Sequence, residues 1–274
     1  MEFDIKRFAL VVKKDLTENR KFYFSFLGGV LAAFVLIYAV GYSIMSNERE
    51  IYVASKSYLD NLYMRIFFFT ALAFITATAV GASFAFSCVS TKAKRISYLS
   101  LPASVGEKFA SRILIVFVLA PVCYLLFWLA VDVLHSVMVS MTIRDDGWYS
   151  ALWTAVDMIA SEITFGSLVK VVLVALAQVS VFLLGSAVFA KYSFVKTLLI
   201  EVAFFTVMGI AISILDMYLV ENVYVETGNV SYRLEFPEIF FSYILPSIIT
   251  AVCFLLSYRI FGRTDINGHK LFRR

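Results

Sequence analysis

The sequence predicts an all-α integral membrane protein with six transmembrane helices, an N-terminal amphipathic helix at the membrane interface, and both termini in the cytoplasm. Three observations predict this fold: the apolar composition, six long apolar runs, and the placement of Lys and Arg. Of 274 residues, 61% are hydrophobic and 16% charged, with a mean hydropathy of +0.85. A soluble domain of this size cannot cover so many apolar side chains, because its surface requires polar residues. Lipid must therefore surround most of the chain.

The spans are predicted from runs long enough to cross a bilayer. Each run approaches or exceeds the about 20 residues that a helix needs to cross about 30 Å of hydrocarbon. The runs are continuous rather than alternating, which favours helices over barrel strands. We expect an interfacial helix over 1–21, a transmembrane domain over 22–258 and a basic tail over 259–274. The six expected spans are 22–45, 66–89, 113–138, 168–190, 197–219 and 239–258.

The orientation follows from the basic residues outside the spans. Residues 1–21, the loops 90–112 and 191–196, and the tail hold eighteen Lys and Arg, whereas the alternate loops hold five. Cytoplasmic loops carry the excess of positive charge. This distribution places both termini and the loop between spans two and three in the cytoplasm.

The N-terminal segment has its own helical pattern. Ile5, Phe8, Val12 and Leu16 recur at spacings of three and four, and basic residues lie off this stripe. Such a helix should lie along the inner leaflet with its basic side chains near anionic headgroups. The alternative is a basic flank that only enforces the topology.

The loop before span three contains a break and a helix start. Pro102 cannot continue a helix, and it favours an extended conformation at the residue before it. Ser104 lies three residues before Glu107, which is the spacing of a capping box. We therefore expect a short basic helix before Pro102, a sharp break, and a capped helix that begins at Val105 and continues into span three.

The stretch LPAS followed by Lys108, after a basic run and before a span, resembles the corresponding loop of ABC-2 type transporter permeases. The six spans, the interfacial N-terminal helix and the cytoplasmic termini resemble the same family. The loop Val220 to Glu238 departs from it, because NVYVETGNVSYRLEF is typical of two extended pieces rather than of the family's re-entrant helices.

The resemblance implies that Lys92 to Pro102 docks on an ATPase subunit that carries ATP and magnesium, while this chain binds no cofactor. It also implies a second permease copy and a location in the bacterial inner membrane. The net charge of +4 is too small to suggest a nucleic-acid partner. The docking residues would be Lys92, Lys94, Arg95, Ile96, Leu99, Leu101 and Pro102. Ser104, Glu107 and Lys108 would form the capped start of a lever into span three.

The sequence contains no catalytic or metal-binding constellation, so we expect that the chain is not an enzyme. No G-x-x-x-x-G-K-[ST] occurs, so any ATP hydrolysis belongs to a partner. His135 and His269 lack ligand spacing, and His135 is expected to pack at the outer interface. Asp145 and Asp146 precede a glycine, which is typical of a solvated turn.

Four ionisable residues fall within the spans: Asp132, Lys170, Glu201 and Asp216. Lys170 either pairs with Asp132 or Asp216 near the outer interface, or all three extend towards the headgroups. Glu201 lies deeper, and it either lines a polar pathway or pairs with Lys191 or Arg112.

Two further patterns concern packing. Ala73, Ala77, Gly81 and Ala85 repeat every four residues along span two, which favours close helix packing within the bundle over a dimer seam. A helical apolar stripe, in a short loop that holds two tryptophans, indicates an interfacial helix between spans three and four. Its residues are Tyr149, Leu152, Trp153, Val156, Ile159 and Ile163.

These features together favour a six-span permease subunit of an ABC-type exporter, working as half of a twelve-span dimer. The alternative from another class is a membrane anchor or accessory subunit that transports nothing. A third possibility, an ion-coupled carrier, would rest on Glu201, and the lack of internal repeats or paired broken helices weakens it.

Overall fold

The computed structural model describes residues 3–47, 56–143, 150–162, 165–189, 191–226, 240–265 and 268–269. These residues are almost entirely helical, apart from the paired two-residue strands β1 (Thr264–Asp265) and β2 (Gly268–His269). The expected six membrane-length helices are confirmed among them. The candidate spans are Arg20–Asn47, Ser57–Val89, Val105–Met141, Gly166–Val188, Ser193–Ile210 and Ser242–Gly262.

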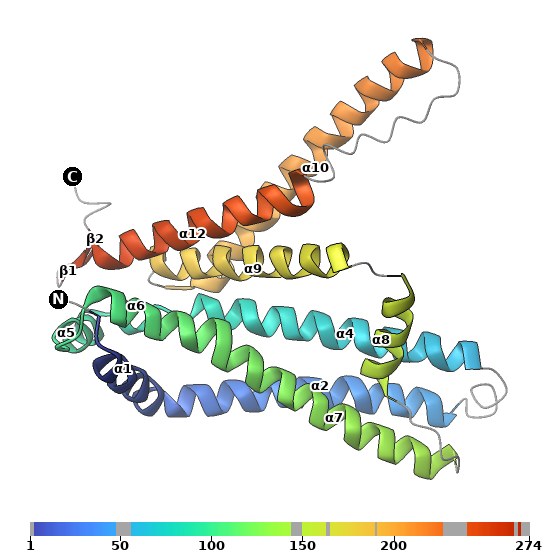
Figure 1. Cartoon of the computed structure of the whole chain (residues 1–274), viewed down its shortest axis with the longest axis horizontal. Coiled ribbons are helices and arrows are strands. Elements are labelled where there is room, and N and C mark those ends of the chain that lie inside the picture. The colour runs from blue at the N-terminus through green and yellow to red at the C-terminus, as the bar shows by residue number, and fades with distance from the viewer. Residues whose placement is uncertain are drawn as a thin grey trace. The chain divides into compact units, whose positions relative to one another are not determined.

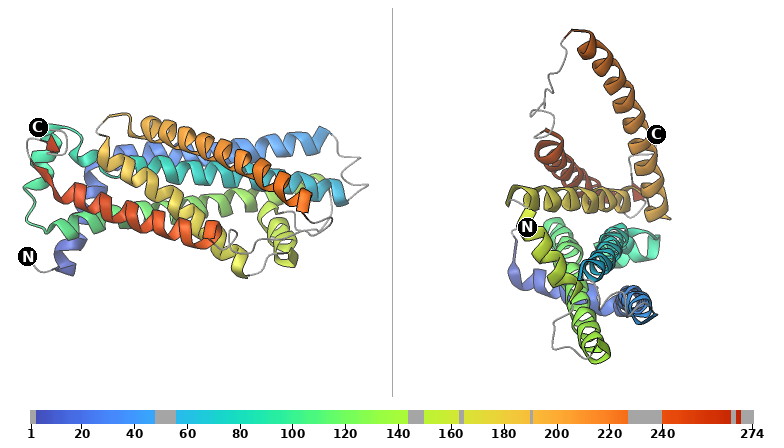
Figure 2. Two further views of the ribbon diagram at one scale, coloured as in Figure 1. Left: turned by 90° about the horizontal axis from the view of Figure 1, so that it is seen from above. Right: turned by 90° about the vertical axis from the view of Figure 1, so that its right-hand side faces the viewer.

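The chain divides into two compact units, which are described separately. The first contains Met1–Ala85 and Ser100–Val169, and the second contains Phe86–Leu99 and Lys170–Arg274. The helices of the first unit are α1 (Ile5–Glu18), α2 (Arg20–Asn47), α4 (Lys56–Ser83), α6 (Val105–Leu114), α7 (Ala120–Ile143) and α8 (Ala151–Glu162). Within it α2, α4 and α7 pack together, α1 lies along α6, and α8 packs across the opposite end (Figures 1 and 2).

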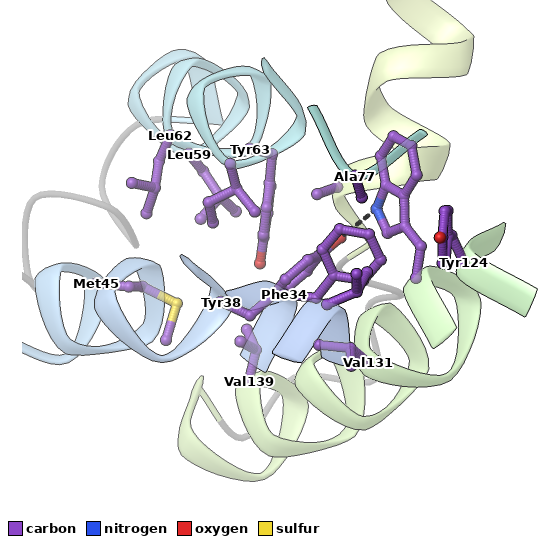
Figure 3. Packing of buried hydrophobic residues seen from close by; sticks show 14 residues of the cluster. Phe34, Tyr38, Met45, Leu59, Leu62, Tyr63, Ala77, Tyr124, Val131 and Val139 are labelled. Carbon is purple, nitrogen blue, oxygen red and sulfur yellow. Dashed lines mark hydrogen bonds between the residues drawn. The ribbon is translucent and has the colours of Figure 1, made fainter. Parts of the chain in front are cut away.

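The core of the first unit is built from aromatic side chains. Phe34 and Tyr38 of α2 meet Trp128 of α7, and Tyr63 of α4 points into the same cluster (Figure 3). Apolar burial between helices is weak as a driving force in lipid, so close packing and internal hydrogen bonds must hold such a bundle. The interlocking rings supply that packing, and the Tyr38 hydroxyl accepts a hydrogen bond from the Trp128 indole at 3.0 Å.

The repeated small residues of span two pack mainly within the bundle. Ala77 and Ala85 are buried, and a methyl group at Gly81 would contact the Tyr124 hydroxyl of α7 at 3.4 Å. Ala73 and Ala77 also line a cavity between α2 and α4. These contacts agree with the expectation of intramolecular packing.

Two prolines within spans are each preceded by a π-helical turn. The turn η2 (Ile115–Leu119) precedes Pro121 in α7, and η3 (Phe240–Ile244) precedes Pro246 in α12 (Leu245–Gly262). Proline lacks an N–H and its ring displaces the carbonyl four residues earlier. A wider turn accommodates that displacement without ending the helix. Both spans therefore continue through their prolines.

The second unit contains η1 (Ser87–Val89), α5 (Lys92–Leu99), α10 (Ser193–Glu226) and α12, and most of α9 (Phe165–Val188). Helices α9 and α10 approach closely at Gly185, where any added Cβ would collide with Thr197. Phe182 and Phe194 stack beside this contact, with their ring centroids 5.4 Å apart. The glycine is therefore required by the close approach of the two helices.

One sequence expectation was wrong. The stretch Asn222–Val225 was expected to be extended, but α10 continues through it to Glu226. β-branched and aromatic residues favour strands only weakly, and extending an existing helix adds one hydrogen bond for each residue fixed. The second expected extended piece and the turn between the two pieces lie outside the described residues.

Candidate functional site

Helix α6 begins with the predicted capping box. Ser104 has an extended backbone, and its hydroxyl accepts a hydrogen bond from the Glu107 N–H at 3.2 Å. One carboxylate oxygen of Glu107 accepts from the Ser104 N–H at 2.8 Å. Helix α5 ends at Leu99 and α6 begins at Val105, so the chain breaks around Pro102 as predicted. The reciprocal hydrogen bonds fix the residue at which span three begins.

The same Glu107 carboxylate also holds the N-terminal helix. Its second oxygen accepts from the Asp4 N–H at 2.8 Å and from the Arg7 guanidinium at 3.2 Å. Asp4 in turn caps α1, because its carboxylate accepts from the Lys6 N–H at 2.8 Å. Glu107 is fully buried, so the Ser104 N–H, the Asp4 N–H and the Arg7 guanidinium replace the hydration of its carboxylate. One side chain therefore starts α6 and anchors the start of α1.

A buried ion pair joins the two helices at a second point. Asp15 of α1 accepts from Arg112 at 2.8 Å and from the Ser111 hydroxyl at 3.0 Å. Asp15 is completely buried and Arg112 is 3% exposed. We call the contacts of Glu107 and Asp15 between α1 and α6 the N-terminal clamp. Helix α1 is thereby fixed to the start of span three at two points.

Part of the apolar surface of α1 is exposed. Val11 and Asp15 are buried against the bundle, whereas Ile5 is 76%, Leu10 65% and Leu16 37% exposed. The expected helix is confirmed. Of its predicted apolar stripe, Ile5 and Leu16 are exposed, whereas Phe8 and Val12 are half-buried. A helix that exposes apolar side chains beside basic ones fits an interfacial position.

Helix α5 presents a basic and apolar surface in the second unit. Lys92, Lys94 and Ile96 are exposed, and Arg95 and Leu99 are half-buried. The opposite face is fixed by Tyr98, which is buried with its ring 6.3 Å from that of Phe261 in α12.

The remaining residues of the expected docking and lever set belong to the first unit. Pro102 is exposed, Leu101 is half-buried, and Lys108 is only 5% exposed. Lys108 therefore contributes to the packing of α6 rather than to an open surface.

Asp132 of α7 is the centre of a buried polar network that joins α2, α7 and the start of α8. It accepts from the Tyr38 hydroxyl at 2.8 Å, from the Ala151 N–H at 2.9 Å and from the Ser150 hydroxyl. Ser150 also accepts from the Trp153 N–H at 3.0 Å, which caps α8. Asp132 is 3% exposed, so it does not extend to the headgroups as one alternative expected. It holds the start of α8 against spans one and three.

The helix expected between spans three and four is confirmed as α8. Trp153 and Val156 of its expected stripe face outward, whereas Leu152 is half-buried against the core. Ala151 and Ala155 are fully buried against the bundle, while Trp153 is 60% and Val156 51% exposed. The small residues allow close contact, and the exposed pair fits an interfacial helix. Tyr149, Ile159 and Ile163 fall outside the residues whose side chains are described.

His135 packs against aromatic rings. It is 5% exposed, and its ring lies edge-on to those of Tyr38, Tyr42 and Tyr63 at 5.1 to 6.4 Å. The expected packing role agrees with this position, although the residue is buried in the bundle. Within the described part of the chain, no group of three His, Cys, Asp or Glu side chains could hold a metal ion.

The other ionisable residues of the spans belong to the second unit. Glu201 is half-buried and hydrogen-bonded to Gln178 of α9, a partner that was not among those expected. Lys170 lies over the ring of Tyr243, 5.5 Å from its centroid. The side chains of Asp216 and His269, and all of Asp145 and Asp146, lie outside the described residues. The ion pair between Lys170 and an aspartate stays a prediction.

Comparisons with models of known protein families, with curated proteins and with solved structures found no match. The geometry must therefore suggest the function by itself. It brings Ser104, Glu107 and Lys108 together on α6, as expected, and adds Asp4, Arg7 and Asp15 from α1. Sequence reasoning missed these three partners, because they lie far from α6 in the sequence. Arg112 is 97 residues from Asp15, and Glu107 is 103 residues from Asp4.

Proposed function

We propose that the chain is the membrane-spanning permease subunit of an ABC-type exporter in a bacterial inner membrane, with both termini in the cytoplasm. A separate ATPase subunit docks on the exposed face of α5, and a second permease copy completes a twelve-span dimer. The proposal rests on the order of the structural elements along the chain. An exposed basic helix is followed directly by a break and by a capped helix that continues into span three.

The clamp supports a mechanical role for this segment. A force applied to residues 92–102 passes along the chain to α6, and the capping box prevents the first turn of α6 from unwinding instead. Helix α1 is bound to α6 through Glu107 and Asp15, so it moves with the start of span three. Movement of the docked ATPase would thereby reach the bundle and the interfacial helix together.

The polar groups within the described spans indicate which class of substrate the chain could transport. Asp132 accepts hydrogen bonds from Tyr38, Ser150 and Ala151, and Glu201 is hydrogen-bonded to Gln178. Hydrogen bonding within the bundle leaves these groups less available to line a polar pathway. A lipid or another apolar substrate therefore fits the proposal best. The same observation favours the second candidate, an accessory subunit that binds partners and transports nothing.

The docking proposal is tested by recovery of the complex. We expect a P-loop ATPase to copurify with the chain after gentle solubilisation, and Ile96→Glu to abolish its recovery. Val195→Glu is the matched control, because Val195 is 51% and Ile96 45% exposed on different helices. Equal recovery with both variants would contradict docking on α5. Recovery of the chain with no ATPase would favour the accessory role.

The lever is tested separately from docking. In the recovered complex, Ser104→Ala should weaken ATPase stimulation and transport while membrane insertion is unchanged, because the cap of α6 is lost. Full transport and stimulation in a chain carrying both Ser104→Ala and Pro102→Ala would contradict the lever and leave the docking result standing.

A further inference from the structure

A groove runs between α2 and α4 in the first unit. Two cavities of about 640 and 460 Å³ lie along it, and Phe69 borders both. The lining residues of α2 and of α4 recur at spacings of three and four, so each helix contributes one face. The groove is therefore a continuous feature of this helix pair.

The second cavity is lined in part by small residues. Gly29 and Ala33 of α2 and Ala73 and Ala77 of α4 line the second cavity. Near the first cavity the helices approach closely, because Gly41 leaves no room for a side chain beside Ile66. The small residues therefore leave space between the two helices at the level of the second cavity.

One end of the groove is polar and carries a positive charge. Tyr58, Asn61 and Arg65 line the first cavity at spacings of three and four on α4. Arg65 is the last charged residue before the uncharged run 66–91, so it lies at the boundary of the apolar part of the span. Arg65 is exposed, and among the described residues it has no ion-pair partner.

The α4 wall of the groove is long enough to hold one lipid acyl chain. From Arg65 to Val80 the α4 wall extends about 22 Å at about 1.5 Å per residue. One leaflet contributes about half of the roughly 30 Å hydrocarbon core. The apolar wall is therefore long enough for an acyl chain that starts at the level of Arg65.

We propose that this groove binds one phospholipid from the leaflet at the α8 end, with its phosphate at Arg65 and one acyl chain along the α2–α4 walls. An Arg guanidinium forms paired, charge-assisted hydrogen bonds to phosphate. Asn61 and Tyr58 supply further polar groups at the same end of the cavity. The site requires neither transport nor an ATPase, so it goes beyond the function proposed above.

The test is native mass spectrometry of the purified full-length chain, titrated with phosphatidylglycerol and with a diacylglycerol of the same acyl chains. We expect one saturable phosphatidylglycerol. Arg65→Gln should weaken its binding about tenfold, which corresponds to about 1.4 kcal/mol. Arg65→Lys should retain more of the binding than Arg65→Gln. Diacylglycerol, which lacks the phosphate, should bind more weakly and be insensitive to Arg65→Gln.

The acyl-chain part of the site has a matched pair of variants. Ala33 lines the groove, whereas the neighbouring Ala32 is exposed and lines neither cavity. Ala33→Leu should weaken binding of both lipids, and Ala32→Leu should bind like the unmodified chain. Equal binding by these two variants, or equal loss of both lipids in Arg65→Gln, would overturn the proposal. The proposal would also be overturned if a second copy of the chain occupied the groove. That occupant would be detected as a dimer that Ala33→Leu dissociates and that added lipid does not dissociate.

Discussion

Removing one partner of the buried ion pair between α1 and α6 should release the N-terminal helix. In Asp15→Asn, Arg112 keeps its charge at 3% exposure and loses the carboxylate 2.8 Å away. Breaking a buried pair in this way costs about 3–5 kcal/mol, because a charge is left buried without its counter-charge. At about 1.4 kcal/mol per tenfold change, the opening equilibrium of α1 should shift by about two to four powers of ten.

Hydrogen exchange of the α1 amides in detergent micelles measures this opening directly. The matched control is Glu18→Gln on the same helix. Glu18 forms an exposed ion pair with Lys14, in which Oε1 lies 3.4 Å from Nζ. Exposed pairs contribute at most about 1 kcal/mol, so its exchange should change less than tenfold. Replacing Asp15 and Arg112 together by Leu should restore most of the protection. Equal exchange in Asp15→Asn and Glu18→Gln would refute the clamp.

Three further predictions concern stability. Ser104→Ala should destabilise the first turn of α6 by about 1 kcal/mol, measured as faster amide exchange at its start. Tyr38→Phe leaves the buried carboxylate of Asp132 with one donor fewer, so thermal unfolding in detergent should report a loss of about 1–3 kcal/mol; an unchanged midpoint would contradict the network. Gly185→Ala should destabilise the chain by about 1–3 kcal/mol through a steric clash, whereas Gly209→Ala, which meets open space within a helix, should stabilise it by up to about 1 kcal/mol. The same sign for both glycine variants would contradict the close approach of α9 and α10.

The features that the sequence predicted correctly depend on nearby residues. A capping box needs only Ser104 and Glu107 at a spacing of three, and a span needs only a long uninterrupted apolar run. Helical stripes in 1–21 and in 149–163 indicated α1 and α8 for the same reason. Local hydrogen bonding and burial in lipid determine these elements without help from distant parts of the chain.

The partners of the buried charges could not be predicted in the same way. Asp15 binds Arg112 and Asp132 binds the start of α8 only because the helices fold against one another, and no local spacing encodes those contacts. A weak signal was present in α1, where Asp15 follows Phe8 and Val11 at spacings of seven and four and therefore lies on the same side of the helix as these apolar residues. A carboxylate on a mostly apolar side of a helix indicates a partner elsewhere, although not which one.

Cross-linking from α5 in intact cells tests the central claim most directly. A photoreactive residue at position 96, where Ile96 is 45% exposed, should yield a product that contains an ATPase with the G-x-x-x-x-G-K-[ST] motif. The same residue at position 98, where Tyr98 is 3% exposed, should yield no such product. Absence of an ATPase from the position-96 product, or reaction there only with reagents confined to the outside of the cell, would contradict the proposed function.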